Sequence, residues 1–389
     1  MGPKQLELSA LSKIGACFLA WIAVAAWLAP ITDVSLQVPD GHVSSVAAAL
    51  DRTCPASPRI ELLNTPSPLV FRTVMEVEEP TAIAVRAGSI VIGSRGGIVR
   101  EWLAGETEPL TLLDLSDDTS RDADQGLLDI GWLEDVLLVL RTDSAGATVL
   151  TAHEDDPGST TGVVLLRVEQ PDPRHNGGGL AILDGGEVAI GIGDGGLQGD
   201  PNSNAGNPNS ALGKILRGRV DLEAGRLIPS GDRDSLVWVS GVRNPHRIWA
   251  GDDGVSVWIT DVGENCREEV NRVLLSEPTY DLGWNSREGD IDFVADPWRI
   301  TTDPLAAYGH TEGRCAVIGG TPAPDNLAAL GVGPASIVAD MCTGELFMVD
   351  SMRMSALPGA AQSPVALASD GLGGVLIAEL GGRVRRLES

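Results

Sequence analysis

One short pattern recurs along this 389-residue chain and limits what it can fold into: a Pro or Gly, an apolar run, a tight turn and a second apolar run. Gly and Asp in the turns, with β-branched residues on both sides, are typical of a β-hairpin. Hairpins that repeat in this way, with insertions between them, predict an all-β chain folded as a six-bladed β-propeller. The six copies begin at Pro80, Gly126, Gly178, Pro245, Pro334 and Pro364.

The composition agrees with such a fold and excludes one class of partner. The chain contains 47 Gly and 24 Pro but only 4% aromatic residues, which suits a turn-rich β domain, and 43% hydrophobic residues are enough for a core. Its formal net charge is −26 at pH 7. Phosphate recognition needs a basic patch, so we exclude nucleic acid as a partner.

An apolar run near the N-terminus, from Ile14 to Pro30, follows Lys4 and Lys13. We expect one N-terminal hydrophobic helix here, with its basic end on the cytoplasmic side of the membrane. No small-residue cleavage site stands out after the run, which favours an uncleaved signal-anchor over a cleaved signal peptide.

This organisation predicts an exported propeller. It is membrane-anchored by the single helix, or secreted or periplasmic if the helix is cleaved, and it meets the membrane through that segment only. The chain then divides into an anchor or signal peptide (1–33), a lead-in (34–67) and the propeller (68–389). We expect the last hairpin to close the ring against strands from the early chain. In an oxidising compartment four cysteines can form disulfides, and three pairings are open: Cys54, Cys266, Cys315 and Cys342.

The hairpin geometry predicts which residues share one mouth of the central channel. The first strand of each copy starts at the face where the second strand ends. Residues that precede a first strand and residues that follow a second strand therefore gather at that face. Histidine can take up a proton near neutral pH, a neighbouring carboxylate can orient it, and arginine can stabilise a developing oxyanion. We therefore predict His175, Asp194 and Arg243 as a catalytic set. The other residues placed at this mouth are Asp124, Gln125, Arg174, Asn176, Asn244, Asp261, Asp350 and Glu379.

Each of these residues also has a purely structural interpretation. His175 would be a turn histidine bonded to local backbone, and Asp194 would belong to a tight Gly-Asp-Gly-Gly turn. Asp261, Asp350 and Glu379 recur at one position of the repeat, which favours a role in ending the blades. The catalytic interpretation depends on the three residues of the set facing the same space.

With these residues in place, the chain resembles the glucose/sorbosone dehydrogenase family. That family includes soluble quinoprotein sugar dehydrogenases and hedgehog-interacting-protein-like propellers. The order and number of the shared motifs make the resemblance specific. The motifs are Gln125-GLLDIGW, His175-NGGGLAI, Gly191-IGDGG, Leu212-GKILR, Gly241-VRNPHRI, Asp261-VGENCREEVNRV and Leu282-GWNSREG.

The resemblance implies an enzyme that oxidises the anomeric carbon of an aldose with pyrroloquinoline quinone (PQQ) and Ca²⁺. It gives His175 the role of the base, Asp194 the role of its support, and Arg243 a contact to the quinone carbonyls. Its substrate would be a small sugar, and the sequence specifies neither which sugar nor the electron acceptor. The resemblance further implies cofactor contacts for Asp124, Gln125, Asn244 and Val262, and Ca²⁺ contacts for Gly263 and Glu264.

A second hypothesis comes from a different functional class. The family's C-terminal lysine and paired arginines, which bind the quinone carboxylates, have no counterpart in residues 323–326 or 341–344. Buried carboxylates need charged or hydrogen-bonding partners, so a tricarboxylate cofactor loses affinity without them. The alternative is a non-catalytic exported propeller that binds a carbohydrate or a protein and has lost cofactor binding.

Overall fold

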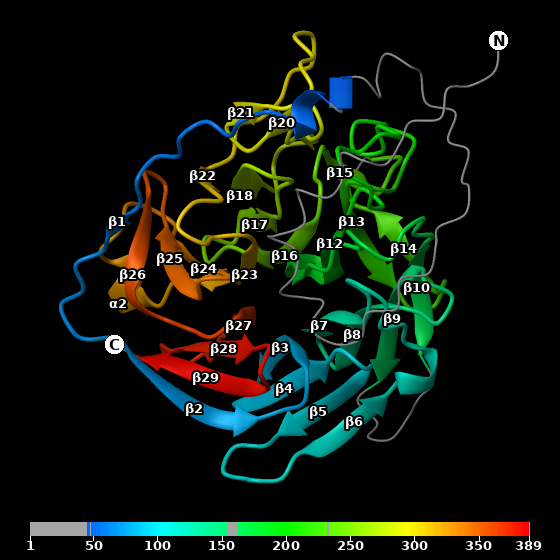
Figure 1. Cartoon of the computed structure of the whole chain (residues 1–389). Coiled ribbons are helices and arrows are strands. Elements are labelled where there is room, and N and C mark those ends of the chain that lie inside the picture. The colour runs from blue at the N-terminus through cyan, green and yellow to red at the C-terminus, as the bar shows by residue number, and fades with distance from the viewer. Residues whose placement is uncertain (1–44, 47, 155–161, 232, 389) are drawn as a thin grey trace. The chain divides into compact units, whose positions relative to one another are not determined.

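The computed structural model describes residues 45, 46, 48–154, 162–231 and 233–388. Within them six β-sheets are arranged as blades around a central axis (Figure 1). This confirms the predicted all-β six-bladed propeller. The innermost strands of the blades contact one another around the axis, in the order β3, β7, β11, β16, β23 and β27.

Blades 1 to 3 run along the chain from the innermost strand outward. Blade 1 contains β3 (Pro80–Arg86), β4 (Ser89–Ser94), β5 (Ile98–Trp102) and β6 (Leu110–Asp114). Blade 2 contains β7 (Leu127–Leu133), β8 (Val136–Thr142), β9 (Thr148–Glu154) and β10 (Val163–Val168). Blade 3 contains β11 (Leu180–Ile182), β12 (Glu187–Ile192), β13 (Lys214–Asp221) and β15 (Val237–Ser240), extended by β14 (Arg226–Pro229) and β19 (Tyr280–Asp281).

Blades 4 to 6 include the later insertions and two strands from the early chain. Blade 4 contains β16 (Pro245–Ala250), β17 (Ser256–Asp261), β18 (Arg267–Leu274) and β22 (Ala306–Gly309). Blade 5 contains β23 (Val317–Pro322), β24 (Ser336–Asp340), β25 (Glu345–Val349), β26 (Met354–Ala360) and β1 (Glu61–Leu62). Blade 6 contains β27 (Pro364–Ser369), β28 (Val375–Glu379), β29 (Arg383–Glu388) and β2 (Val70–Glu76). Other elements are the hairpin of β20 (Arg287–Glu288) and β21 (Ile291–Asp292), the short helix α2 (Asp325–Ala328), and the 3₁₀ turns η3 (Ser116–Asp118) and η4 (Asp184–Gly186).

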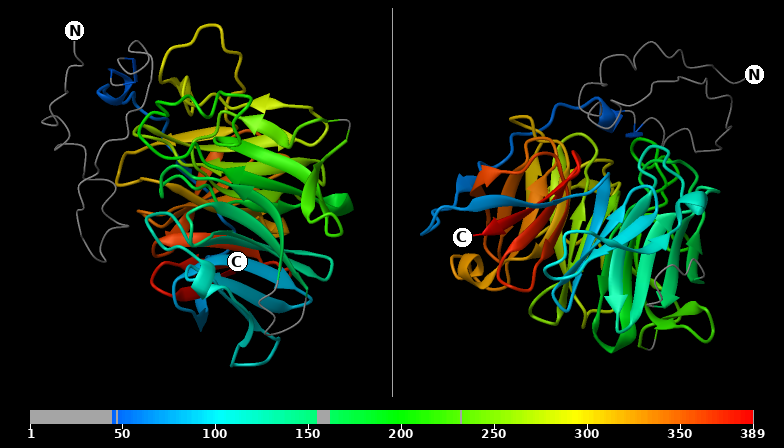
Figure 2. Two further views of the ribbon diagram at one scale, coloured as in Figure 1. Left: turned by 90° about the vertical axis from the view of Figure 1, so that its right-hand side faces the viewer. Right: turned by 90° about the horizontal axis from the view of Figure 1, so that it is seen from below.

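The early chain closes the ring, as the sequence predicted. Strand β2 pairs antiparallel with β29, so the two ends of the propeller share blade 6, and the views in Figure 2 show the two strands side by side. Strand β1 pairs parallel with β26 at the edge of blade 5. The lead-in therefore contributes a strand of its own to the propeller.

The core lies between the blades, because each sheet packs against a neighbour on both faces. Strand β8 illustrates this with six of its seven residues buried. Leu138 and Leu140 pack in the cluster shared with blade 3, whereas Leu137 and Val139 point the other way into the cluster shared with blade 1. This two-sided burial explains why the inner strands are nearly continuous apolar runs.

The fifth copy of the repeat is a correction to the sequence analysis. Its two apolar runs form β24 and β25, the second and third strands of blade 5, rather than the first and second. The innermost strand β23 contains Gly319 and Gly320 and lacks the apolar run of the other copies. A Cβ on Gly320 would lie 2.0 Å from ring atoms of Trp249 on blade 4, so the packing of the blades requires glycine there.

This shift changes which carboxylate belongs to the channel mouth. Asp340 ends β24 and so takes the position that we assigned to Asp350. Asp350 follows β25, which runs in the opposite direction, and it accepts the backbone N–H of Val332 in the loop that precedes β24. Asp350 therefore lies at the opposite face of the propeller.

Arg247 on β16 links four blades across the axis. Its Nη1 lies 2.6 Å from Oδ1 of Asp129 on β7, and its Nη2 donates to the carbonyl of Thr81 on β3 at 2.7 Å and of Val365 on β27 at 3.4 Å. Burial raises the pKa of Asp129, and the charge of Arg247 opposes that rise. This buried pair braces the innermost strands around the channel.

The four cysteines form two disulfides, Cys54–Cys266 and Cys315–Cys342. The first ties the lead-in to the loop that connects β17 and β18. In the part of the chain that the structure describes, no helix has the length and apolar character needed to cross a membrane. The hydrophobic helix expected from Ile14 to Pro30 lies outside the described residues.

Candidate active site

The structure brings the three residues of the predicted catalytic set together at the channel mouth, the end of the channel where β7, β11 and β16 begin. His175 lies in the loop before β11, Asp194 follows β12, and Arg243 precedes β16. All three are at least nine-tenths buried, with residue exposures of 7%, 0% and 3%. They come from two neighbouring blades, so the fold itself assembles the set.

His175 is held at one ring nitrogen and free at the other. Its Nδ1 lies 2.8 Å from Oδ1 of Asp194, and its backbone N–H donates to Oδ2 of Asp124 at 2.8 Å. Its φ of 52° lies in the left-handed region, and a Cβ on Gly193 would lie 1.9 Å from its carbonyl oxygen, so glycine allows the two loops to meet. No described residue hydrogen-bonds Nε2, which leaves that atom available to a substrate.

Asp194 is itself oriented by fixed donors. Nε1–H of Trp284 donates to Oδ2 at 2.8 Å, and the backbone N–H of Gly196 donates to Oδ1 at 3.0 Å. Burial raises the pKa of Asp194, while the Arg243 charge and the Trp284 hydrogen bond oppose that rise. The carboxyl group therefore has one geometry in which to hold the imidazole.

Burial, together with the positive charge of Arg243, lowers the pKa of His175 well below its ordinary value of 6.5. The imidazole is therefore neutral at physiological pH, which is the form that can take up a proton. A neutral imidazole whose Nδ1–H donates to an ionised Asp194 has Nε2 as its free acceptor, which is the arrangement of a general base.

Arg243 is fixed on one side and open on the other. Its Nε donates to Oε2 of Glu264 at 3.1 Å, its Nη1 donates to the carbonyl of Val262 at 3.0 Å, and its guanidinium carbon lies 5.7 Å from the centre of the Trp284 ring. No described residue accepts from Nη2. The charge is thus oriented by its partners but retains a free donor at the mouth.

Two of the predicted neighbours support the loops around the set. Asp261 accepts the backbone N–H groups of Arg243 at 2.8 Å and of Asn244 at 2.7 Å, which favours the structural interpretation of that carboxylate. Oδ1 of Asn244 accepts the backbone N–H of Gly177 at 3.1 Å, and its Nδ2 has no partner among the described residues.

The other residues predicted to contact the cofactor have polar atoms that already bond within the protein. Asp124 supports His175 through its carboxylate, as described. Gln125 is committed locally, because its Oε1 accepts from Ser120 and its Nε2 donates to the carbonyl of Gly146 at 3.5 Å. The carbonyl of Val262 is occupied by Arg243, as described above.

The predicted metal contacts lie in the loop after β17. Oε2 of Glu264 accepts from Nε of Arg243 and from the backbone N–H of Gly199, each at 3.1 Å, whereas Oε1 accepts no hydrogen bond from a described residue. The backbone carbonyls of Gly263 and Glu264 accept no hydrogen bond from a described residue. Across the described residues, no group of three or more His, Cys, Asp or Glu is arranged to hold a metal ion.

The blade 5 and blade 6 side of the mouth is occupied by internal contacts. Asp340 accepts the Tyr308 hydroxyl at 2.9 Å and the backbone N–H of Cys315 at 3.0 Å, among other donors. Glu379 pairs with Arg383 at 3.0 Å, whereas Arg314 makes a two-point contact with Glu345 at 2.7 and 2.9 Å. The sequence analysis missed these arginines because they lie outside the segments in which it sought the family's cations.

Trp284 and Glu288 are site residues that the sequence analysis did not single out. Both belong to the quoted motif Leu282-GWNSREG, so the motif was the available signal. Their contacts lie far away in the sequence, since Trp284 bonds Asp194 and Glu288 bonds the loop at 264–267. Spacing alone does not predict such contacts.

Comparison with known proteins decides the family. A family model described as glucose/sorbosone dehydrogenase matches residues 77–302, more than half of the chain. The chain belongs to the glucose/sorbosone dehydrogenase family. This confirms the resemblance inferred from the motifs.

One relative of this family member is the HIPL2 protein of Arabidopsis thaliana. The two are 28% identical over 183 residues, which are 39% of this chain and only 26% of that protein. The chain thus matches about a quarter of the length of this curated relative.

Solved structures of sugar dehydrogenases share the fold. The PQQ-bound aldose sugar dehydrogenase of Streptomyces coelicolor has a TM-score of 0.66 at 18% identity, covering 84% of this chain and 99% of that one. The soluble aldose sugar dehydrogenase of Escherichia coli, in its apo form, has a TM-score of 0.65 at 18% identity, covering 82% and 99%. At these identities the likeness shows the fold alone.

Proposed function

We propose that this chain is an aldose dehydrogenase that oxidises the anomeric carbon of a sugar with PQQ and Ca²⁺. The observation that carries the proposal is the buried, neutral His175, held through Nδ1 by Asp194 and free at Nε2, beside the oriented charge of Arg243. Family membership and a PQQ-bound protein of the same fold support the choice of reaction and cofactor.

The polar atoms left free at the mouth fit such a cofactor. Nη2 of Arg243 and Nδ2 of Asn244 are donors without a described partner, and they match the carbonyl oxygens of a quinone. The backbone carbonyls of Gly263 and Glu264 are hard oxygen donors of the kind that Ca²⁺ prefers. These residues would hold the quinone and the ion.

The chain's own residues would then carry out the proton transfer. Bound PQQ would supply an acceptor for the hydride of the anomeric carbon, so that the aldose leaves as its lactone. Nε2 of His175 takes the proton of the anomeric hydroxyl, and Asp194 stabilises the imidazolium that forms through its contact to Nδ1. Trp284 and Gly196 keep the carboxylate in place during this transfer.

We also propose that the propeller acts outside the cytoplasm, anchored by the segment Ile14 to Pro30 or released from it. The two disulfides support an oxidising compartment. Within this proposal the anchor or signal peptide is 1–33, the lead-in 34–67 and the propeller 68–389.

The decisive experiment uses the full chain, purified in detergent and supplied with PQQ and Ca²⁺. We expect aldose-dependent reduction of an artificial dye that depends on both additions. Chelation of Ca²⁺ should abolish the signal, and its return on adding Ca²⁺ is the control. Dye reduction that is absent across a panel of aldoses would rule out the dehydrogenase.

A second candidate function is a non-catalytic propeller that binds a carbohydrate or protein. The observation that favours it is the pairing of Arg314 and Arg383 with glutamates, so that neither of these two described arginines is a free cation for a quinone carboxylate on the blade 5 and blade 6 side. Sugar binding detected by calorimetry in the absence of any PQQ binding would support this alternative.

A further inference from the structure

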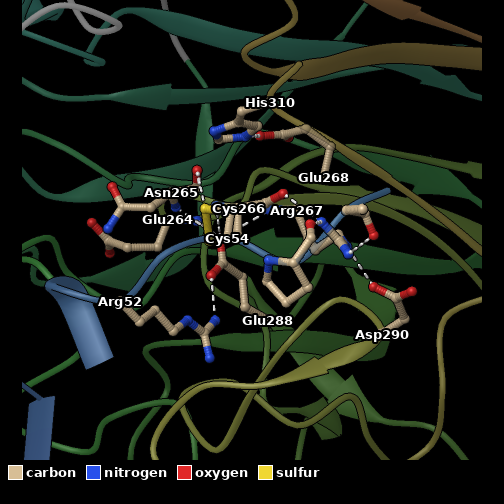
Figure 3. Close-up of a disulfide and its surroundings, with 12 residues drawn as sticks. Arg52, Cys54, Glu264, Asn265, Cys266, Arg267, Glu268, Glu288, Asp290 and His310 are labelled. Atoms are coloured by element: carbon tan, nitrogen blue, oxygen red, sulfur yellow. Dashed lines mark hydrogen bonds and ion pairs between the residues drawn. A yellow bond between two sulfur atoms is a disulfide. The ribbon is translucent and has the colours of Figure 1, made fainter. Parts of the chain in front are cut away.

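Glu288 in β20 makes an unusual set of contacts for a buried carboxylate. Its Oε1 accepts four consecutive backbone N–H groups, at 3.0, 2.7, 2.6 and 3.1 Å in chain order, and the residue is only 2% exposed. Figure 3 shows the side chain beneath this loop, next to a disulfide. The four donors are Glu264, Asn265, Cys266 and Arg267.

The second oxygen of Glu288 connects the loop to the lead-in. Nη2 of Arg52 donates to Oε2 at 3.0 Å, and two residues further along the lead-in Cys54 forms its disulfide with Cys266. Arg267 reaches back in the other direction, with its Nη atoms 3.1 and 3.2 Å from the carbonyls of Pro55 and Ala56. The lead-in, which precedes the family match at residue 77, is thereby fastened to the loop from several sides.

The same loop carries the partner of the mouth arginine. Glu264 contributes a backbone N–H to Glu288 and a carboxylate to Nε of Arg243, and both side chains of that ion pair are at most 3% exposed. A displacement of the loop would therefore move Glu264 and leave Arg243 without its oriented partner. It would also move the carbonyls at 263 and 264.

We infer that Glu288 is a positioning residue for the channel mouth: it holds residues 264–267 in place and so sets the Arg243–Glu264 pair and the neighbouring carbonyls. The inference rests on the proposed function, because Glu288 affects cofactor binding only if the cofactor binds beside the Arg243–Glu264 pair. The physical basis is direct: removal of the Glu288 carboxylate takes away the acceptor of four backbone N–H groups, three of them in buried residues.

Asp350 provides a matched control at the opposite face. It is a 1% exposed carboxylate that accepts three backbone N–H groups, those of Met352 at 2.7 Å, Arg353 at 3.0 Å and Val332 at 3.1 Å. Substitution of Asp350 removes a comparable backbone anchor without touching the mouth. Any effect shared by the two variants reports loss of stability alone.

The first measurement is amide hydrogen exchange of the full chain, followed by mass spectrometry, and it needs no cofactor. In Glu288→Ala we expect exchange at 264–267 to accelerate by about ten-fold or more, because opening the loop now costs less. In Asp350→Ala that segment should exchange as in the wild type. Unchanged exchange at 264–267 in Glu288→Ala would overturn the inference, whether or not the protein binds PQQ.

The second measurement is PQQ affinity by calorimetry in the presence of Ca²⁺. We expect Glu288→Ala to weaken binding by about ten-fold or more and Asp350→Ala to leave it unchanged. Glu288→Gln keeps a weaker, neutral oxygen acceptor and should recover most of the exchange protection and the affinity lost in Glu288→Ala. If Glu288→Ala fails to fold, Glu288→Gln is compared with the wild type, and exchange at 264–267 that is no faster than in the wild type would overturn the inference. Faster exchange with unchanged affinity would show that Glu288 holds the loop but does not position the site, which contradicts the inference.

Absence of PQQ binding in the wild type would contradict the proposed function. The exchange result would then decide by itself whether Glu288 holds residues 264–267.

Discussion

The two sides of the channel mouth use the same positions of the repeat for different purposes. On the side formed by blades 2 to 4, which we term the His175 side, Asp194 follows a second strand and orients a histidine. On the side formed by blades 5 and 6, which we term the Asp340 side, Asp340 and Glu379 end the equivalent strands. Asp340 accepts a tyrosine hydroxyl and backbone N–H groups, and Glu379 pairs with arginines.

This difference shows that position in a propeller repeat selects a face of the molecule but does not decide the chemistry there. A carboxylate becomes a candidate catalytic group only where its partner retains a free atom, as His175 does at Nε2. Where the donors belong to backbone or to a paired arginine, the same carboxylate stabilises the end of a blade. The predictions below test whether the two sides differ in this way.

The largest effect should come from removing the base. His175→Ala is expected to lower aldose-dependent dye reduction by about 10²–10⁴-fold, the usual contribution of a positioned general base. Glu379→Gln, at the Asp340 side, should change the rate by less than about two-fold. The measurement is the steady-state rate of dye reduction with both variants saturated in PQQ. Equal losses of rate in the two variants would contradict a functional difference between the two sides.

The next effect concerns stability. Arg243→Ala leaves Glu264 buried without its ion-pair partner and should lower the free energy of unfolding by about 3–5 kcal/mol. Arg314→Ala removes a more exposed pair on the Asp340 side and should cost about 1 kcal/mol or less. Urea denaturation of the full chain measures both, and a cost for Arg314→Ala as large as that for Arg243→Ala would contradict the contrast.

Acid should affect two histidines of blade 4, His246 and His310, with opposite signs. Burial, with a contribution from Arg247, lowers the pKa of His246 on β16 to about 3. Burial lowers the pKa of His310 as well, but its hydrogen bond to Glu268 and the negative charges of Glu268, Glu288 and Asp340 together outweigh this, and the net shift of the pKa is upward. Below pH 6.5 the unfolded state therefore binds a proton that native His246 does not, so that residue makes the fold less stable as pH falls. The stability that His310 contributes is fully present below 6.5 and lost as pH rises through its raised pKa.

The comparison of variants isolates each histidine. Between pH 7 and pH 5 the wild type should lose up to about 2 kcal/mol more unfolding free energy than His246→Gln does, since each fully shifted group contributes about 1.4 kcal/mol per pH unit. Over the same interval it should gain stability relative to His310→Gln. Denaturation curves at the two pH values give both differences, and the same sign for both would show that one assignment is wrong.

The smallest predicted effect is a gain of function on the Asp340 side. Glu345→Gln releases Arg314 from its two-point contact and supplies a freer cation for a quinone carboxylate. We expect PQQ affinity to rise by about two- to five-fold, the range of an exposed ion pair. Glu187→Gln is the control: Glu187 starts β12 on the opposite face and pairs with Arg217 of β13, and its substitution should leave PQQ affinity unchanged.

The sequence was sufficient for the architecture and for the core of the site. The repeat predicted six blades and the shared face of His175, Asp194 and Arg243, because strand direction alone places them. It misassigned the fifth blade, where Gly320 makes room for Trp249 and so removes the apolar run.

Other features depend on contacts that a linear pattern does not encode. The disulfide pairing, the contact of Trp284 with Asp194 and the support of 264–267 by Glu288 join residues that are 21 or more positions apart. Each is a consequence of where an insertion folds, and insertions lack the periodicity of the blades. The N-terminal helix lies outside the described residues and stays a prediction.

The most direct test of the central claim, that the His175 side holds the cofactor, is a calorimetric titration of the full chain with PQQ in excess Ca²⁺. The account predicts saturable binding of one PQQ per chain, near or below about 1 μM (about −8 kcal/mol), that Arg243→Ala abolishes and Asp350→Ala retains. No heat of binding at a hundred-fold higher PQQ concentration, or binding that survives Arg243→Ala unchanged, would contradict it.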